Sequence, residues 1–100
     1  MAAIQLVKQF AGGMNLAAFL EDVKTQSAVL YQIQIIGEAC SHVSERLRSA
    51  HPEVPWRDIV GMRNNLVHEY FGVDLMLVWT TVVDDLPTLE NQMDAVLQSL

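Results

Sequence analysis

Residues 22–50 read DVKTQSAVLYQIQIIGEACSHVSERLRSA and carry the longest apolar pattern of the chain. Apolar side chains recur there at alternating steps of four and three, the spacing of a helix that packs along one face. These positions are Val29, Ile33, Ile36, Cys40, Val43 and Leu47. We expect one helix from Asp22 to Ala50, ended by His51-Pro52, because the residue before a proline is pushed out of the helical region.

The residues before this helix predict two shorter ones. Apolar side chains at helical spacing indicate a helix from Ala2 to Phe10, which the Gly12-Gly13 pair ends. Asn15 is a good N-cap for a short accessory helix over Leu16 to Glu21. Within the long helix, Gly37 costs ~1 kcal/mol relative to alanine. We therefore expect Gly37 to mark a close approach between helices.

Two further helices follow the long one. Pro55 suits the first turn of a helix that runs from about Trp56 to His68. Asp74 can cap a last helix, whose apolar stripe continues through Pro87 to the end of the chain, so we expect one helix with a kink there. Residues 1–100 then form a single all-α domain, a four-helix bundle with one short accessory helix.

Composition indicates the setting of this domain. Hydrophobic residues make up 51% of the chain and charged residues 18%, which is apolar for a small monomer and favours an interface with a second subunit. No run approaches the ~20 apolar residues of a membrane span, and no signal-peptide pattern is present. The single cysteine, Cys40, excludes an intramolecular disulfide and a four-cysteine zinc site, and we expect it to be a small buried apolar residue. We expect a cytoplasmic protein.

The formal net charge of −6 argues against broad nucleic-acid binding, because affinity for phosphate normally comes from clustered lysines and arginines. An RNA site must therefore be local, and the acidic excess can instead suit a basic partner protein. The six basic residues are Lys8, Lys24, Arg46, Arg48, Arg57 and Arg63.

Five hydrogen-bonding side chains are concentrated within eight residues: Arg63, Asn64, His68, Glu69 and Tyr70. On a regular helix Asn64 and His68 lie ~40° apart, whereas Arg63 and His68 lie ~140° apart. One regular copy of this helix therefore makes a poor site. Either the end of the helix unwinds, or two copies of the chain place arginine and histidine around a shared cleft.

These residue types suit RNA cleavage without a metal or another cofactor. Histidine titrates near neutral pH and can exchange a proton with a ribose oxygen, while arginine offers a permanently charged fork for phosphate. Asn64 can orient the histidine or the phosphate, and the 2′-hydroxyl would be the nucleophile. The structural alternatives are that Arg63 pairs with Glu69 or Asp58, and that His68 caps the end of its helix.

The segment from Gly61 to Asp74, GMRNNLVHEYFGVD, resembles the signature of HepT-like toxins, a branch of the HEPN superfamily. Their motif Arg-x4-His-x-Tyr is matched at Arg63, His68 and Tyr70. The likeness extends over nearly the whole chain in the same order, so it is more specific than the motif alone. The supporting stretches are Lys24-Thr-Gln-Ser-Ala-Val29, Ile35-Ile-Gly-Glu-Ala39, Pro52-Glu-Val-Pro-Trp-Arg-Asp-Ile59, Val78-Trp79 and Asp85-Leu-Pro87.

This resemblance implies a homodimer of HEPN-type bundles, with the two motifs meeting in a cleft at the interface. It implies a metal-independent endoribonuclease with Arg63 and His68 as catalytic residues and Asn64 in support. It also implies a type VII toxin–antitoxin system, in which an MntA-type nucleotidyltransferase antitoxin transfers AMP to Tyr70. The added charge would repel RNA phosphate.

The first helix departs from the family pattern because it begins near the middle of the usual first helix, which indicates a late start codon or a truncated chain. Two other functions remain open. The chain can be a non-catalytic HEPN module that binds a nucleotide or scaffolds a nucleotidyltransferase, or it can serve chiefly as a substrate for modification. The neighbouring gene and the response of the chain to ATP and that partner distinguish them.

Overall fold

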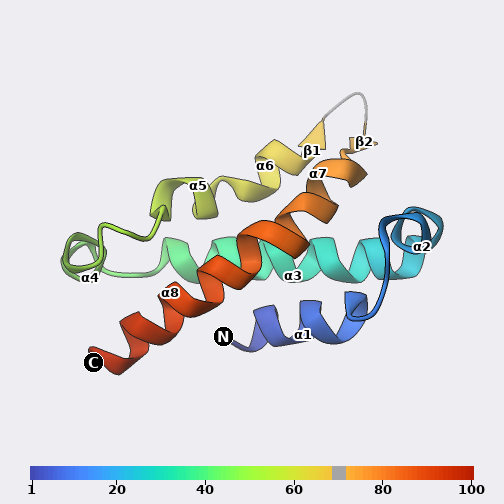
Figure 1. The fold of residues 1–100 in the computed structure, drawn as a ribbon. Coiled ribbons are helices and arrows are strands. Elements are labelled where there is room, and N and C mark those ends of the chain that lie inside the picture. The colour runs from blue at the N-terminus through green and yellow to red at the C-terminus, as the bar shows by residue number, and fades with distance from the viewer. Residues whose placement is uncertain (69–71) are drawn as a thin grey trace.

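The computed structural model describes residues 1–68 and 72–100. Within them, α3 runs through the middle of the molecule, with α1 along one side and α5 and α6 along the other (Figure 1). The last helical stretch, α7 to α8, crosses in front of α3. The helices are α1 Ala2–Ala11, α2 Leu16–Glu21, α3 Val23–Ser41, α4 Glu45–Ala50, α5 Trp56–Val60, α6 Met62–Leu66, α7 Leu75–Thr80, the π-helix η1 Thr81–Asp85 and α8 Leu86–Gln98.

This arrangement confirms the all-α class and the four helical passes expected from the sequence. The sequence did not predict two short strands of two residues each, β1 Val67–His68 and β2 Gly72–Val73, which pair antiparallel. Over the described ranges, no helix is both long and apolar enough to cross a membrane.

The core forms where the predicted apolar stripes meet. The stripe of α3 is almost completely inaccessible to solvent, and those of α1 and α8 pack against it. Asn15 and Asp74 cap their helices as expected: their Oδ1 atoms accept hydrogen bonds from the backbone N–H of Ala18 at 2.8 Å and of Leu77 at 3.1 Å.

The prediction of one helix from Asp22 to Ala50 was wrong, because α3 ends at Ser41 and α4 begins at Glu45. Ser44 starts the new helix by accepting a hydrogen bond from the N–H of Leu47 at 3.2 Å. Arg48 then reaches back from α4, and its Nη2 donates to the carbonyls of Cys40 and Ser41 at 2.9 and 3.0 Å. The apolar spacing continued across a break whose free carbonyls are satisfied by this arginine.

The last helix continues through Pro87, as the stripe indicated, but with a π-helical turn, η1, just before it. Proline lacks the N–H of a regular helical hydrogen bond, and its ring collides with the preceding turn. A π turn is one of the recognised ways in which a helix absorbs such a disturbance. Thr81 lies in η1 with its hydroxyl donating to the carbonyl of Leu77 at 2.9 Å.

Gly37 marks a close approach, as expected. A Cβ atom at this position would lie 3.1 Å from the carbonyl oxygen of Ile59 and 3.4 Å from that of Val60. The backbone of α5 therefore packs directly on α3, and α5 leads into the segment that carries Arg63.

We expect Gly37→Val to lower the free energy of unfolding by about 1–3 kcal/mol, the usual cost of overpacking a well-packed site. Urea denaturation measures it. Ala39→Val is the matched control, because Ala39 is exposed on the same helix and receives the same branched side chain. Because valine is a better helix former than glycine, helix propensity alone would make Gly37→Val more stable. A free energy of unfolding no lower than that of the parent would therefore refute the close contact with α5.

Candidate functional site

Helix α6 positions the first half of the motif. Its Leu66 is 1% exposed and, with Ile59 of α5, anchors the segment in the core. Arg63 and Asn64 lie on the same short helix and are exposed. Three consecutive polar residues, Arg63 to Asn65, stand between the partly buried Met62 and the buried Leu66, and the fold presents all three to solvent.

The second half of the motif is not helical, so the expected helix from Trp56 to His68 was wrong. The helix is interrupted at Gly61, ends at Leu66, and Val67 has an extended backbone, φ −115° and ψ 121°. His68 then belongs to β1 and pairs with Gly72 of β2. The ~40° relation between Asn64 and His68 therefore does not apply. Val67 occupies the C-cap position, and the His68 side chain lies outside the part of the chain that the structure describes.

Backbone hydrogen bonding explains why the helix stops there. The N–H of Asp74 donates to the carbonyl of Leu66 at 2.7 Å, so the chain that returns through β2 takes an acceptor at the end of α6. Gly72 has φ +75°, in the left-handed region that favours glycine. The helix therefore ends between Arg63 and His68, as a site formed by these two residues within one copy of the chain would require. Glu69 and Tyr70 lie outside the described residues.

The charge on Arg63 is uncommitted within the described part of the chain. No ion pair or hydrogen bond of its side chain occurs there, and the alternative of a pair with Asp58 was wrong. The ion pairs that do form are elsewhere, such as Lys8 Nζ to Glu90 Oε1 at 2.6 Å, a hydrogen bond that lowers the pKa of the Glu90 carboxyl. A solvent-exposed guanidinium with no carboxylate partner among the described residues can bind an anionic ligand. Glu69, the other alternative partner, lies outside those residues.

The described residues include three other side chains that could in principle react: the thiol of Cys40 and the imidazoles of His42 and His51. Cys40 is 1% exposed, and burial raises the pKa of its thiol, so it is the buried apolar residue that the sequence predicted. His42 and His51 have carboxylate neighbours, Glu38 at 3.2 Å and Glu53 at 3.1 Å. Over residues 1–68 and 72–100, no group of three or more His, Cys, Asp or Glu side chains is placed to hold a metal ion.

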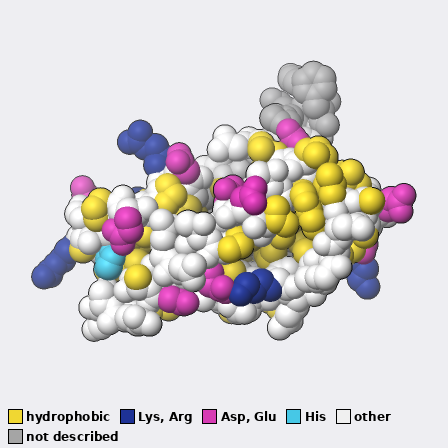
Figure 2. Space-filling view, viewed as in Figure 1, with side chains coloured by type: hydrophobic (Ala, Val, Ile, Leu, Met, Phe, Trp, Pro, Cys, Tyr) yellow, Lys and Arg dark blue, Asp and Glu magenta, His cyan; other side chains and the backbone are white. Residues whose placement is uncertain are grey.

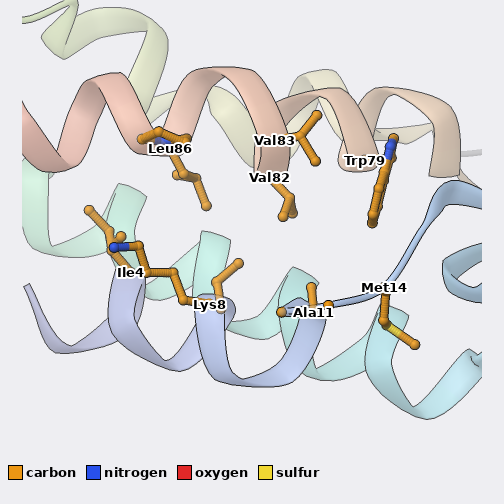
Figure 3. Close-up of a pocket in the computed structure, with 12 residues that line it drawn as sticks. Ile4, Lys8, Ala11, Met14, Trp79, Val82, Val83 and Leu86 are labelled. Carbon is orange, nitrogen blue, oxygen red and sulfur yellow. The ribbon is translucent and has the colours of Figure 1, made fainter.

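Two hollows flank the bundle. A cleft of about 420 Å³ lies between α5–α6 and η1–α8; its lining includes Asp58 and Met62 but neither Arg63 nor Asn64. A second, apolar groove of about 270 Å³ lies between α1 and η1. In Figure 3 Ile4, Lys8 and Ala11 form one wall of it and Val82, Val83 and Leu86 the other, with Trp79 near one end. Neither Arg63 nor Asn64 lines this groove.

Comparison with known proteins identifies the family. The model of the HepT-like family, described as ribonuclease HepT-like, matches residues 1–96. A probable ribonuclease HepT of Thermococcus cleftensis is 41% identical over 92 residues, which cover 92% of this chain and 84% of the relative. No solved structure matches the chain significantly.

Two further relatives, at lower identity, are described as putative RNases. A putative RNase of Caldanaerobacter subterraneus subsp. tengcongensis is 38% identical over 86% of this chain and 77% of its own length. A putative RNase of Methanocaldococcus jannaschii is 34% identical over 90% and 83%, respectively. The match to the family model spans α1 to α8 and includes Arg63, Asn64 and His68. The chain therefore belongs to the HepT-like family of HEPN-type ribonucleases.

Proposed function

We propose that this chain is a metal-independent endoribonuclease whose catalytic residues are Arg63 and His68, with Asn64 in support. The observation that carries the proposal is the end of helix α6 at Leu66, three residues after Arg63. Arg63 itself is exposed and has no carboxylate partner in the described residues. The family match supplies the reaction class. Cleavage of single-stranded RNA by the purified protein in the presence of EDTA tests it.

The reaction needs one proton acceptor and one proton donor. His68 takes the proton of the ribose 2′-hydroxyl, whose oxygen attacks the adjacent phosphorus. The bond from phosphorus to the 5′-oxygen breaks, and a protonated imidazole supplies the proton that the leaving oxygen requires. The products are a 2′,3′-cyclic phosphate and a 5′-hydroxyl. Arg63 stabilises the extra negative charge on the phosphoryl oxygens in the transition state.

We infer a homodimer in which Arg63 of one copy and His68 of the other lie around a shared cleft. The outward face of α3 supports this, because Tyr31 is 61% exposed and Ile35, one turn later, is 37% exposed. An apolar stripe on the outside of the central helix is a surface that a second subunit can cover. Mixed dimers of Arg63→Ala and His68→Ala subunits test the arrangement.

We also infer the role of toxin in a type VII toxin–antitoxin system in the cytoplasm, neutralised when an MntA-type nucleotidyltransferase transfers AMP from ATP to Tyr70. An adenylyl group brings negative charge and bulk to the segment that follows His68. It would therefore repel the RNA phosphate that Arg63 attracts. A small nucleotidyltransferase gene beside this one would support the pairing.

Tyr70→Phe tests this role. Incubated with that partner, Mg²⁺ and ATP, the parent is expected to gain mass in steps of one AMP in an intact-mass spectrum, and Tyr70→Phe is expected to gain none. Tyr31→Phe is the matched control, because Tyr31 is the other of the two tyrosines of the chain. Modification that persists in Tyr70→Phe and disappears in Tyr31→Phe would move the site to α3.

A non-catalytic HEPN module remains the second candidate, favoured by the net charge of −6. It predicts a purified protein that cleaves no RNA and yet retains a nucleotidyltransferase in a pull-down.

A further inference from the structure

The positive charges of this acidic chain are few, and the structure divides them into two kinds. Lys8 is bound to Glu90 at 2.6 Å, and Arg48 is bound to the carbonyls of Cys40 and Ser41. These two side chains hold helices together. In the described part of the molecule the other four take part in no ion pair or side-chain hydrogen bond, and all four are exposed; they are Lys24, Arg46, Arg57 and Arg63.

Position separates these four. Lys24 lies at the start of α3 beside α2, and Arg46 lies in α4, at the opposite end of the molecule (Figure 1). Arg57 and Arg63 lie in α5 and α6, which follow each other along one edge and are joined at Gly61. Their Cα atoms lie within ~20 Å of each other, because six residues of chain advance at most about 3.3–3.6 Å each, and an RNA strand covers that distance within a few nucleotides. Arg57 is thus the exposed positive charge nearest in sequence to the motif, and it has no ion pair with any residue that the structure describes.

We propose that Arg57 binds a backbone phosphate of the RNA strand, one or more nucleotides away from the phosphate that Arg63 holds for cleavage. The proposal rests on the proposed ribonuclease function and extends its site from α6 along α5. Guanidinium groups bind phosphate through paired hydrogen bonds and keep their charge at any working pH. The surroundings of Arg57 supply no competing partner in the described residues.

The same count of charges restricts the substrate. Duplex RNA is held by contacts to phosphates across successive grooves, which requires a wide basic surface. Figure 2 shows the opposite on the face it displays, where acidic side chains outnumber the few basic ones. Two exposed arginines along one edge, with no ion pair among the described residues, suit a single strand that follows α5 and α6. A single-stranded RNA is therefore the probe for the Arg57 contact.

Binding to a short single-stranded RNA tests the proposal. A fluorescein-labelled RNA of eight nucleotides is titrated, by fluorescence anisotropy at several salt concentrations, into the full chain carrying His68→Ala, which prevents cleavage. For single strands each phosphate contact contributes about −0.7 to the slope of log affinity against log salt. Adding Arg57→Gln is expected to weaken binding about tenfold at low salt, and to make the slope shallower by about 0.7.

Matched variants identify the cause. Arg46→Gln removes the same charge from α4 and is expected to change neither affinity nor slope, while Arg57→Lys is expected to keep the slope and lose part of the affinity. In the active protein Arg57→Gln is expected to raise KM with kcat retained, because this phosphate contact is the same in the ground and transition states.

Each contrary result has its own meaning. If Arg57→Gln and Arg46→Gln bind RNA equally, or if Arg57→Gln lowers kcat as strongly as Arg63→Ala, this inference is overturned and the ribonuclease proposal stands. If the His68→Ala parent binds no RNA at any salt concentration, both are overturned.

Discussion

His68→Ala is expected to lower the rate of RNA cleavage by about 10²–10⁴-fold, the usual contribution of a general acid–base group. The remaining protein still binds RNA, because the arginines are intact, so the loss should appear in kcat. Growth arrest on expression is expected to disappear with it. Cleavage of a fluorogenic RNA substrate under single-turnover conditions is the measurement.

Arg63→Ala is expected to lose activity on a similar scale, by about 10²–10³-fold, because removing one preorganised donor to the transition state has this effect in other enzymes. Arg63 is exposed and has no partner in the described residues, so its removal should leave the thermal midpoint unchanged. Asn65→Ala is the matched control: Asn65 is exposed on the same helix, and the motif does not include it.

A folded His68→Ala protein that cleaves RNA at the parent's rate would refute the site.

Mixing the two inactive variants distinguishes a site shared across a dimer from a site within one copy. If Arg63 of one copy works with His68 of the other, a mixed dimer of Arg63→Ala and His68→Ala contains one intact pair and regains part of the activity. If the pair acts within one chain, every copy in the mixture is defective and activity stays absent. The mixture is prepared by co-expression with two affinity tags.

Phe19→Ala is expected to lower the free energy of unfolding by about 3–5 kcal/mol, the range for removing a buried aromatic side chain. Phe19 is completely buried although its helix, α2, has only six residues. Its ring lies 5.2 Å from that of Trp79, centroid to centroid, at an interplanar angle of 40°, a tilted contact that joins α2 to α7. The cavity left by alanine would sit between them.

Thermal unfolding monitored by circular dichroism measures this effect. Each kcal/mol corresponds to about 4–8 °C for a domain of this size, so the midpoint should fall by well over 10 °C. Leu20→Ala is the control, because Leu20 is the next residue of the same helix and is 39% exposed. Protein concentration must be held constant, since a dimer's midpoint depends on it. A midpoint for Phe19→Ala equal to that of Leu20→Ala would show that α2 is dispensable for the core.

The helix caps and apolar stripes could be predicted from the sequence, because they depend on residues three or four positions apart. Asn15, Asp74 and the α3 stripe needed no knowledge of the rest of the molecule, and neither did the close approach at Gly37. The complete burial of Phe19 could not be predicted in this way. A single aromatic residue in a short segment forms no periodic apolar pattern, so the sequence indicated only an accessory helix.

The sequence by itself determined the class of fold, the family and the residues of the motif, because helical spacing and the motif are local properties of the chain. Only the tertiary structure decided where the helices end. Arg48 satisfies carbonyls seven and eight residues earlier, and Asp74 takes the carbonyl of Leu66, so α3 and α6 stop although the apolar spacing continues. That second break removes His68 from the helix of Arg63. The physical reason is that a helix terminus depends on which distant group satisfies its last carbonyls, and a periodic pattern does not contain that information.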